Sequence, residues 1–228
     1  MLENLAYISY VLPLLAFAWK RTSRPTSGVI AFYCLYIILN EILIWYIREG
    51  RIYRVYEKAE LLAYSLFTII EYACLSYTIY CFFERPLFKK LVYVFACIFG
   101  VVAASNLYLN LTSKEGISEL YDSIPLATSG IFLIILCILS LFEEMQNPVI
   151  GFIYITYKFW IILGIMIYFA GTFFFFLNYT AINRTDKEIF WYLNWISIIF
   201  KNIFFSIAFL MPKDDPNREL EESYFPEN

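Results

Sequence analysis

Residues 153–178 read IYITYKFWIILGIMIYFAGTFFFFLN, and Lys158 is the single charged residue in this run. An α-helix rises about 1.5 Å per residue, so about 20 mostly apolar residues cross the hydrocarbon core of a bilayer. The run is longer than that minimum. It therefore predicts a membrane-spanning helix, and its length favours a tilted one.

Six further stretches meet the same criterion, with short polar connectors between them. The predicted spans are Leu5–Trp19, Gly28–Ile47, Leu61–Phe83, Leu91–Leu109, Ile124–Phe142 and Ile189–Met211. The sequence thus predicts an all-α fold, a polytopic transmembrane bundle of about seven helices within residues 1–211. Residues 212–228 are rich in Asp, Glu, Pro and Asn, which predicts an acidic, disordered cytoplasmic tail that could dock a signalling partner.

The overall composition agrees with a membrane protein and excludes one class of partner. Hydrophobic residues make up 61% of the 228 residues, more than a globule of this size can bury, so we expect contact with the lipid bilayer. Charged residues make up only 16% and lie mostly between the apolar runs. The net charge of -3 argues against a protein built to hold nucleic acid.

Histidine is absent from the chain, and this absence removes several kinds of chemistry. The usual ligand sets for zinc, haem and di-iron centres are incomplete without it, and so is any His-dependent catalytic triad. All five cysteines lie in apolar stretches, so we expect no disulfide framework. We therefore predict no metal, no cofactor and no enzymatic activity.

The orientation has to be taken from the first predicted span. Lys and Arg residues of the loops divide almost evenly between the two sides of the membrane, so they do not decide it. The first span begins near Glu3 and ends before Lys20 and Arg21. This pattern favours an external N-terminus and a cytoplasmic C-terminus.

Four charged residues fall inside predicted spans, and they are the first candidates for function. Glu41 lies in the second span, Glu71 in the third, Lys158 near the start of the sixth and Lys201 in the seventh. Such a residue at the bilayer centre costs roughly 2.5 to 3.5 kcal/mol on insertion scales, so it usually faces other helices and finds a partner. We expect Lys158 to reach the membrane surface. Glu41 has two candidate partners, Arg48 and Lys201.

Polar residues follow one face of the third span and one face of the seventh. The face of the third span, in alternating steps of three and four, consists of Glu57, Glu60, Tyr64, Phe67, Glu71, Cys74, Thr78 and Cys81. The face of the seventh consists of Asn194, Ser197 and Lys201, with Asn202 beside it. Counted from opposite helix ends, Glu71 and Lys201 both reach mid-membrane, so we predict that they pair. The pair could fix packing only, or could form a ligand, proton or ion site.

Small residues and one lysine suggest two further interpretations. Gly164, Tyr168 and Gly171 share a face of the sixth span, a pattern typical of close helix packing. A lysine midway along a seventh helix is also where retinal-binding proteins hold their chromophore as a Schiff base. Ser197, one turn before Lys201, stands where those proteins have an aspartate counter-ion, so we expect no retinal.

Three stretches together resemble a known group of membrane proteins. They are IIEYACLSYTIYCFFERPLFKKLV (69–92), FWIILGIMIYFAGTFFFFLN (159–178) and WYLNWISIIFKNIFFSIAFL (191–210). The resemblance is to an uncharacterised family of small seven-span proteins of Bacteroidota, in which Glu71, the run Tyr168 to Gly171, and Lys201 match. More loosely, the chain is similar to the membrane-embedded sensing domains of bacterial histidine kinases. The resemblance implies a bacterial inner membrane but no agreed activity, and it leaves any signalling role dependent on a separate partner.

Three functions remain open at this point. The first is a sensor or accessory subunit that binds a small or lipidic ligand and acts through a partner. The second is a proton- or ion-coupled transporter or channel that uses Glu71 and Lys201, although no inverted repeat supports it. The third is a purely structural membrane subunit. An intramembrane enzyme acting on lipid is the weakest alternative, because the spans lack a nucleophile with a base.

Overall fold

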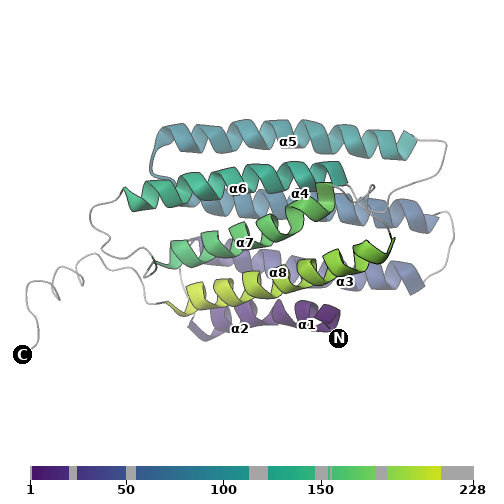
Figure 1. Cartoon of the computed structure of the whole chain (residues 1–228), viewed down its shortest axis with the longest axis horizontal. Helices are drawn as coiled ribbons and strands as arrows, with labels where there is room; N and C mark the ends of the chain where they lie inside the picture. Colours follow the sequence, from purple (N-terminus) through teal and green to yellow (C-terminus); the bar gives the residue numbers. More distant parts are fainter. Residues whose placement is uncertain are drawn as a thin grey trace, which may run out of the picture.

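A computed structural model describes residues 2–20, 25–49, 55–112, 123–146, 154, 156–177 and 184–211. Within these ranges the chain forms helices joined by turns, and no strand occurs among them. The helices are α1 (Leu2–Ser9), α2 (Val11–Lys20), α3 (Pro25–Glu49), α4 (Val55–Phe82), α5 (Pro86–Thr112), α6 (Ser123–Met145), α7 (Tyr157–Leu177) and α8 (Arg184–Leu210). They run side by side along the long axis of the molecule (Figure 1).

Within the described residues, six helical segments are long and apolar enough to cross a membrane. Five of them belong to α3, α4, α5, α6 and α8, and the sixth is the segment Leu2–Lys20. Helix α7 corresponds to the predicted sixth span, and its apolar part is Tyr157–Phe173 among the residues whose side chains are described. The chain is therefore a multi-pass helical membrane protein, as its composition indicates.

The predicted first span, Leu5–Trp19, lies within the apolar segment Leu2–Lys20, but it consists of two helices because the helix breaks at Tyr10. Pro13 has no N–H group to donate to the carbonyl of Ser9, and its ring crowds that carbonyl. The backbone tightens instead, and Tyr10 N donates to Tyr7 O at 3.3 Å. The break turns Tyr10 into the bundle, where only 3% of its surface stays exposed.

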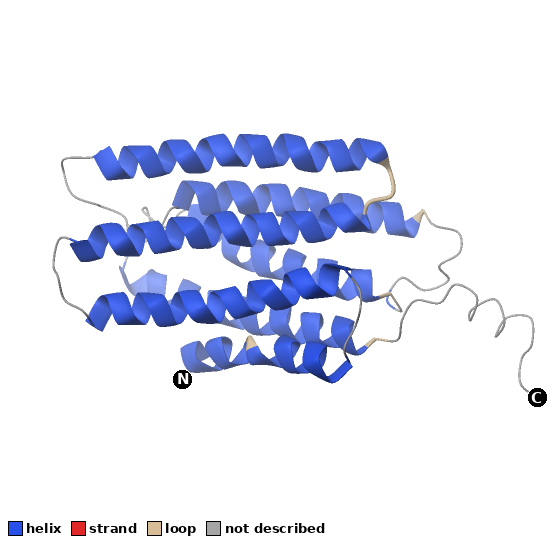
Figure 2. Cartoon of the chain, turned by 180° about the vertical axis from the view of Figure 1, so that it is seen from behind, coloured by secondary structure: helices blue, strands red, loops and turns tan. Residues whose placement is uncertain are grey.

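The packing order places the first and last described helices together. Helix α8 packs most extensively against α7 and also contacts both α1 and α2. Helix α3 packs against α4 and α2, whereas α1 packs mainly against α8. Helix α5 contacts α4 and α6 at one edge of the bundle, opposite α1 and α2, as both views show (Figure 1, Figure 2). Lys20 Nζ also donates to the carbonyl of Leu210, which ties α2 to the C-terminal end of α8.

The half of the bundle nearest Lys20 is filled by apolar side chains. Those with no exposed surface in this half include Leu75, Ile79, Leu133, Leu136, Ile161, Ile162, Ile165, Phe205 and Ala208. They come from α4, α6, α7 and α8, so four helices are joined there by close packing. The described residues of this half are closely packed, and we call it the closed half.

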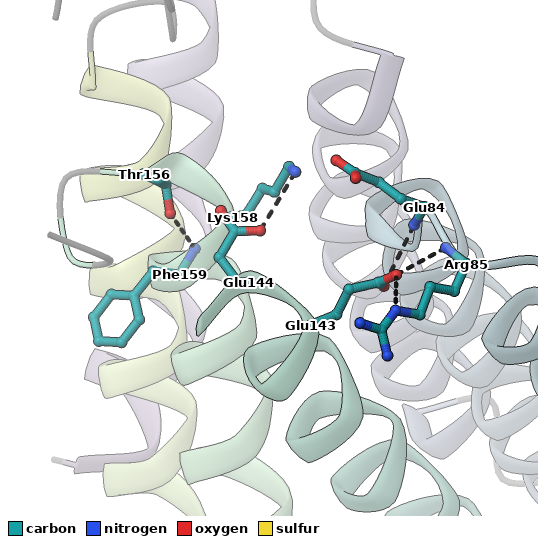
Figure 3. A network of polar contacts seen from close by, with 7 residues as sticks. All are labelled: Glu84, Arg85, Glu143, Glu144, Thr156, Lys158 and Phe159. Atoms are coloured by element: carbon teal, nitrogen blue, oxygen red, sulfur yellow. Dashed lines mark hydrogen bonds and ion pairs between the residues drawn. The ribbon is translucent and has the colours of Figure 1, made fainter. Parts of the chain in front are cut away.

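Charged groups fix the turns at the same end (Figure 3). Glu143 accepts hydrogen bonds from the backbone N–H of Arg85 at 2.8 Å and of Glu84 at 3.3 Å, just before α5 begins. A carboxylate at a helix N-terminus is favourable because of the helix dipole. Lys158, for which we predict a position near the membrane surface, pairs with Glu144 at 3.4 Å.

Candidate functional site: a caged lysine and the cavity above it

Glu71 of α4 and Lys201 of α8 lie side by side in the interior. The Nζ of Lys201 is 3.8 Å from the Oε1 of Glu71, and the two side chains are 0% and 2% exposed. Removing both charges from water is costly, so the pair depends on further polar contacts. The structure supplies these contacts from α3, α7 and the break between α1 and α2.

The hydroxyl of Tyr33 connects the two charged groups. Lys201 Nζ donates a hydrogen bond to Tyr33 Oη at 2.6 Å, and Tyr33 Oη donates to Glu71 Oε1 at 2.5 Å. Tyr33 has no exposed surface. A hydroxyl that accepts from the ammonium and donates to the carboxylate uses both of its hydrogen-bonding capacities. The three residues therefore form one continuous polar network.

Aromatic rings enclose the ammonium group on its remaining sides. The Nζ of Lys201 is 3.8 Å from the ring centre of Tyr168, 4.9 Å from that of Tyr33 and 5.5 Å from that of Tyr10. Such cation–π contacts are strongest where water is excluded, at about 2 kcal/mol or more. We call Lys201, Glu71 and the three tyrosines, Tyr10, Tyr33 and Tyr168, the lysine cage.

The lysine cage lies near the middle of the helices that build it. At 1.5 Å per residue, Lys201 is about 14 Å along α8 from Leu210, and Tyr33 is about 12 Å along α3 from Pro25. Glu71 and Tyr168 are each about 17 Å from the matching ends of α4 and α7. These four side chains come from distant parts of the sequence and meet because each lies at a similar depth from the same end of the bundle.

A cavity of about 530 Å³ extends from the lysine cage toward the end of the bundle where α1 begins. Tyr10 and Tyr168 belong both to the cage and to the cavity lining. The lining consists of Glu3, Tyr7, Tyr10, Ile37, Asn40, Glu41, Tyr64, Phe67, Thr68, Leu126, Tyr168, Trp191, Tyr192, Asn194, Trp195 and Ile198. Its size is within the range of small-molecule sites. Lys201 and Glu71 are not part of this lining, so the two tyrosines separate them from the cavity.

A second, smaller cavity of about 360 Å³ lies alongside α1 and α3. It shares Glu3, Tyr7, Tyr10, Ile37 and Glu41 with the larger cavity. Its other lining residues are Ile38, Ile42, Ile44 and Trp45. Trp45 and Ile42 are 63% and 56% exposed, so this cavity leads to the outer face of α3. That face is apolar and would meet lipid.

The polar residues predicted as candidates divide between the cage and the cavity. Glu71 and Lys201 form the pair, whereas Tyr64 and Asn194 line the larger cavity. Glu41 also lines the cavity, and of its two candidate partners Lys201 pairs instead with the carboxylate of Glu71. The side chain of its other candidate partner, Arg48, lies outside the described residues.

The remaining candidates of α8 bind the neighbouring helices. Asn202 is fully buried and donates from Nδ2 to Ser9 Oγ at 2.7 Å, which joins α8 to the end of α1. Ser197 faces Gly171 of α7 so closely that a Cβ on that glycine would collide with the serine hydroxyl. Gly164 lies against α8 one turn away from Tyr168, and a Cβ there would be 3.3 Å from the carbonyl oxygen of Lys201.

The polar face predicted for the third span is internal over most of its length. Glu60, Glu71 and Thr78 are all buried. Cys81 is exposed, so the inward face ends before it. The side chain of Glu57 lies outside the described residues.

Sequence reasoning missed Tyr10 and Tyr33, two of the three tyrosines of the cage. The chain has 20 tyrosines, so no single one is conspicuous. Two signals could have identified them. Counting from helix ends places Tyr33 at the depth of Lys201, and Pro13 marks a helix break next to Tyr10.

The donor set of the site favours an organic ligand over a metal. Among the described residues no group of three or more His, Cys, Asp or Glu side chains could hold a metal ion. The polar groups of the cavity are carboxylates, amides and hydroxyls set among aromatic rings. Such a site orients a small molecule by a few polar contacts within an apolar wall.

Comparison with protein-family models, with curated proteins and with solved structures gave no match for this chain. The resemblance to the Bacteroidota family therefore stays a prediction.

Proposed function

We propose that this multi-pass membrane protein binds a small or lipidic ligand in the larger cavity and acts as a sensor or accessory subunit through a partner. One observation carries the proposal: Tyr10 and Tyr168 line the cavity and also contact the ammonium group of Lys201. A ligand that moves either ring would change the surroundings of a buried charge pair. Occupancy of the cavity would thereby alter the packing of the bundle.

The break between α1 and α2 supports a route for such a change. Tyr10 lies at the break, and α1 packs mainly against α8 and is held to it by the hydrogen bond from Asn202 to Ser9. A short helix with one principal neighbour can shift without repacking the other helices. A ligand contacting Tyr7 and Tyr10 would favour one position of α1 over another, which is how small local contacts become helix shifts.

Transport through the bundle is less well supported than ligand binding. The buried Glu71–Lys201 pair near mid-depth is the observation in favour of proton- or ion-coupled transport. A transport path would have to continue toward Lys20, where apolar residues such as Leu75, Ile161 and Phe205 have no exposed surface.

A purely structural subunit is also less well supported, because such a subunit needs no cavity. We include no retinal, because Lys201 does not line either cavity described above.

The proposal includes the setting predicted from the sequence. The protein would lie in the bacterial inner membrane with its N-terminus outside, so the cavity would face the outer side and the closed half the cytoplasm. The acidic residues 212–228 would contact the partner, and they lie outside the described residues. No enzymatic activity is part of the proposal.

Native mass spectrometry of the full chain in lipid nanodiscs tests this function. Leu126→Trp places a bulky ring in the cavity, whereas Ile131→Trp places the same ring on the 41% exposed outer face of α6. We expect the wild-type protein and Ile131→Trp to retain a bound molecule and Leu126→Trp to lose it. Equal retention by both variants, or a folded wild-type protein that carries nothing, would overturn the proposal.

A further inference from the structure

The cavity presents negative charge and no described positive charge. Both Glu3 and Glu41 belong to its lining, and they belong to the lining of the smaller cavity as well. Neither Lys nor Arg occurs among the described residues of either lining. Charged walls of one sign raise the local concentration of ligands of the opposite sign. The lining thus favours a cationic ligand.

Aromatic rings make up much of the remaining wall. They are Tyr7, Tyr10, Tyr64, Phe67, Trp191 and Trp195, with Tyr168 and Tyr192 completing the set. The faces of such rings attract ammonium groups, and Trp gives the strongest contact. Rings and carboxylates together are the combination by which proteins recognise quaternary and primary ammonium compounds. The lysine cage is an internal example, because Lys201 is held by the same two kinds of group.

A buried acceptor without a partner points to the same kind of ligand. Asn194 lines the cavity and is 6% exposed, and its Oδ1 atom is buried without a hydrogen-bond partner. An unsatisfied buried acceptor costs about 1 to 3 kcal/mol. An ammonium N–H could donate to this oxygen. The headgroup of an ionised carboxylate or phosphodiester ligand, which has no proton to donate, could not.

The charge of Lys201 does not reverse this preference. Its ammonium group is paired with Glu71, donates to Tyr33 and lies behind the rings of Tyr10 and Tyr168. An anionic ligand in the cavity would therefore meet the carboxylate of Glu41 and no free cation among the described lining residues.

The smaller cavity adds an apolar branch to the site. It continues from Glu41 along α3 past Ile38, Ile42 and Trp45, and the last two residues are largely exposed on the outer face. An alkyl chain placed there would leave the site between α1 and α3, on the apolar side of the bundle.

We propose that the two cavities together bind an amphipathic ammonium compound, with its cationic group at Glu41 and Asn194 and its alkyl chain between α1 and α3. The inference rests on the proposed function and names the ligand class for the same site. A membrane lipid with an ammonium headgroup and a free alkylamine share this chemistry, and the experiment separates them.

Tryptophan fluorescence provides the measurement, because Trp45, Trp191 and Trp195 line the cavities and the chain has five tryptophans. The full chain in nanodiscs of an uncharged glycolipid, which has no ammonium headgroup, is titrated with decylammonium, decanol and decanoate. We expect saturable binding of the cation at least tenfold tighter than of decanol or decanoate. Binding of decanoate as tight as that of the cation would overturn the assignment of the ligand class.

Two substitutions on one helix test the role of Glu41. We expect Glu41→Gln to weaken cation binding at least tenfold and Glu41→Asp to restore most of it. The matched control is Glu49→Gln, since Glu49 is exposed at the end of α3 and lines neither cavity. An affinity unchanged by Glu41→Gln contradicts the proposal.

Further comparisons distinguish a lipid headgroup from a free amine as the ligand. They also distinguish an error in the ligand class from an error in the proposed function. Adding phosphatidylethanolamine to the nanodiscs lowers the apparent affinity for decylammonium if a lipid headgroup occupies the site, and leaves it unchanged if a free amine is the natural ligand. If decanoate binds best and Leu126→Trp blocks it, the ligand class is wrong but the proposed function stands. If no probe binds and no molecule is retained, both are wrong.

Discussion

The ammonium group of Lys201 lies 3.8 Å from the centre of the Tyr168 ring, and the same ring lines the cavity. We expect Tyr168→Phe to keep most of this attraction, since the ring face remains. Tyr168→Leu should lower the free energy of unfolding by at least 1 kcal/mol more than Tyr168→Phe, because it removes a desolvated cation–π contact. Chemical unfolding in mild detergent measures both variants. Equal losses would show that the ring face does not stabilise the ammonium group.

Tyr33 should matter more for its hydroxyl than for its ring. Tyr33→Phe removes the group that joins Lys201 to Glu71, so we expect a loss of about 1 to 3 kcal/mol in the free energy of unfolding. Tyr72→Phe is the matched control, because the Tyr72 hydroxyl is buried without a hydrogen-bond partner. That substitution should be neutral or slightly stabilising. A Tyr33→Phe variant as stable as Tyr72→Phe would refute the bridging role.

The charge pair should show strong coupling between its two members. Glu71→Gln and Lys201→Met each leave one buried group without its charged partner, so each should cost about 3 to 5 kcal/mol. The double variant should lose less than the two single losses combined, by about 1 to 3 kcal/mol. Unfolding of all four proteins under one condition gives the coupling energy. Fully additive losses would mean that the two side chains do not interact.

The contact between α7 and α8 at Gly171 should be sensitive to a single methyl group. Gly171→Ala forces the Ser197 hydroxyl out of its position, so we expect a loss of about 1 kcal/mol. Adding Ser197→Ala should restore most of that loss, because the hydroxyl is the atom in the way. Gly100→Ala on α5 meets nothing within 4 Å and should stabilise the helix by about 0.5 to 1 kcal/mol. Failure of the serine substitution to rescue would contradict this contact.

The two halves of the bundle should differ in access to water. Thr68 lines the cavity and Thr78 lies in the closed half, and each donates from Oγ1 to the carbonyl four residues earlier in α4. In a background without the five native cysteines, we expect Thr68→Cys to react with a soluble maleimide and Thr78→Cys to stay unreacted. With the proposed orientation, the reagent acts from the outer side. Labelling of both positions would favour a continuous transport path.

The helical architecture could be predicted from hydropathy, because backbone N–H and C=O groups in lipid must bind one another, and a helix achieves this within one segment. Counting residues from opposite ends of their helices was enough to predict that Glu71 and Lys201 lie at the same depth. In the structure, the Nζ of Lys201 lies 3.8 Å from the Oε1 of Glu71. Both residues are charged within apolar runs, which makes them conspicuous in a sequence. Their pairing then follows from the cost of leaving either one alone.

The tyrosines and the cavity could not be derived in the same way. Tyrosine is common in this chain and suits interfaces, cores and lipid contacts alike, so its type does not reveal its role. A cavity depends on where side chains fail to fill space, and that follows from rotations of helices that a hydropathy profile does not contain. For Glu41, the sequence predicts the depth in the membrane. It does not predict that this side chain lines the cavity, whose lining does not include Lys201.

The position of Lys201 on the last described helix has a consequence for biogenesis. Tyr33 and Glu71 belong to α3 and α4, which leave the ribosome well before α8. Until α8 arrives, the carboxylate and the tyrosine hydroxyl have no ammonium group to bind, and the partly made bundle holds an uncompensated acidic group in lipid. Insertion of α8 supplies the counter-charge and the main neighbour of α7 in one step. Insertion of α8 and completion of the core are therefore the same event, and a chain truncated before Lys201 keeps a buried carboxylate without this counter-charge.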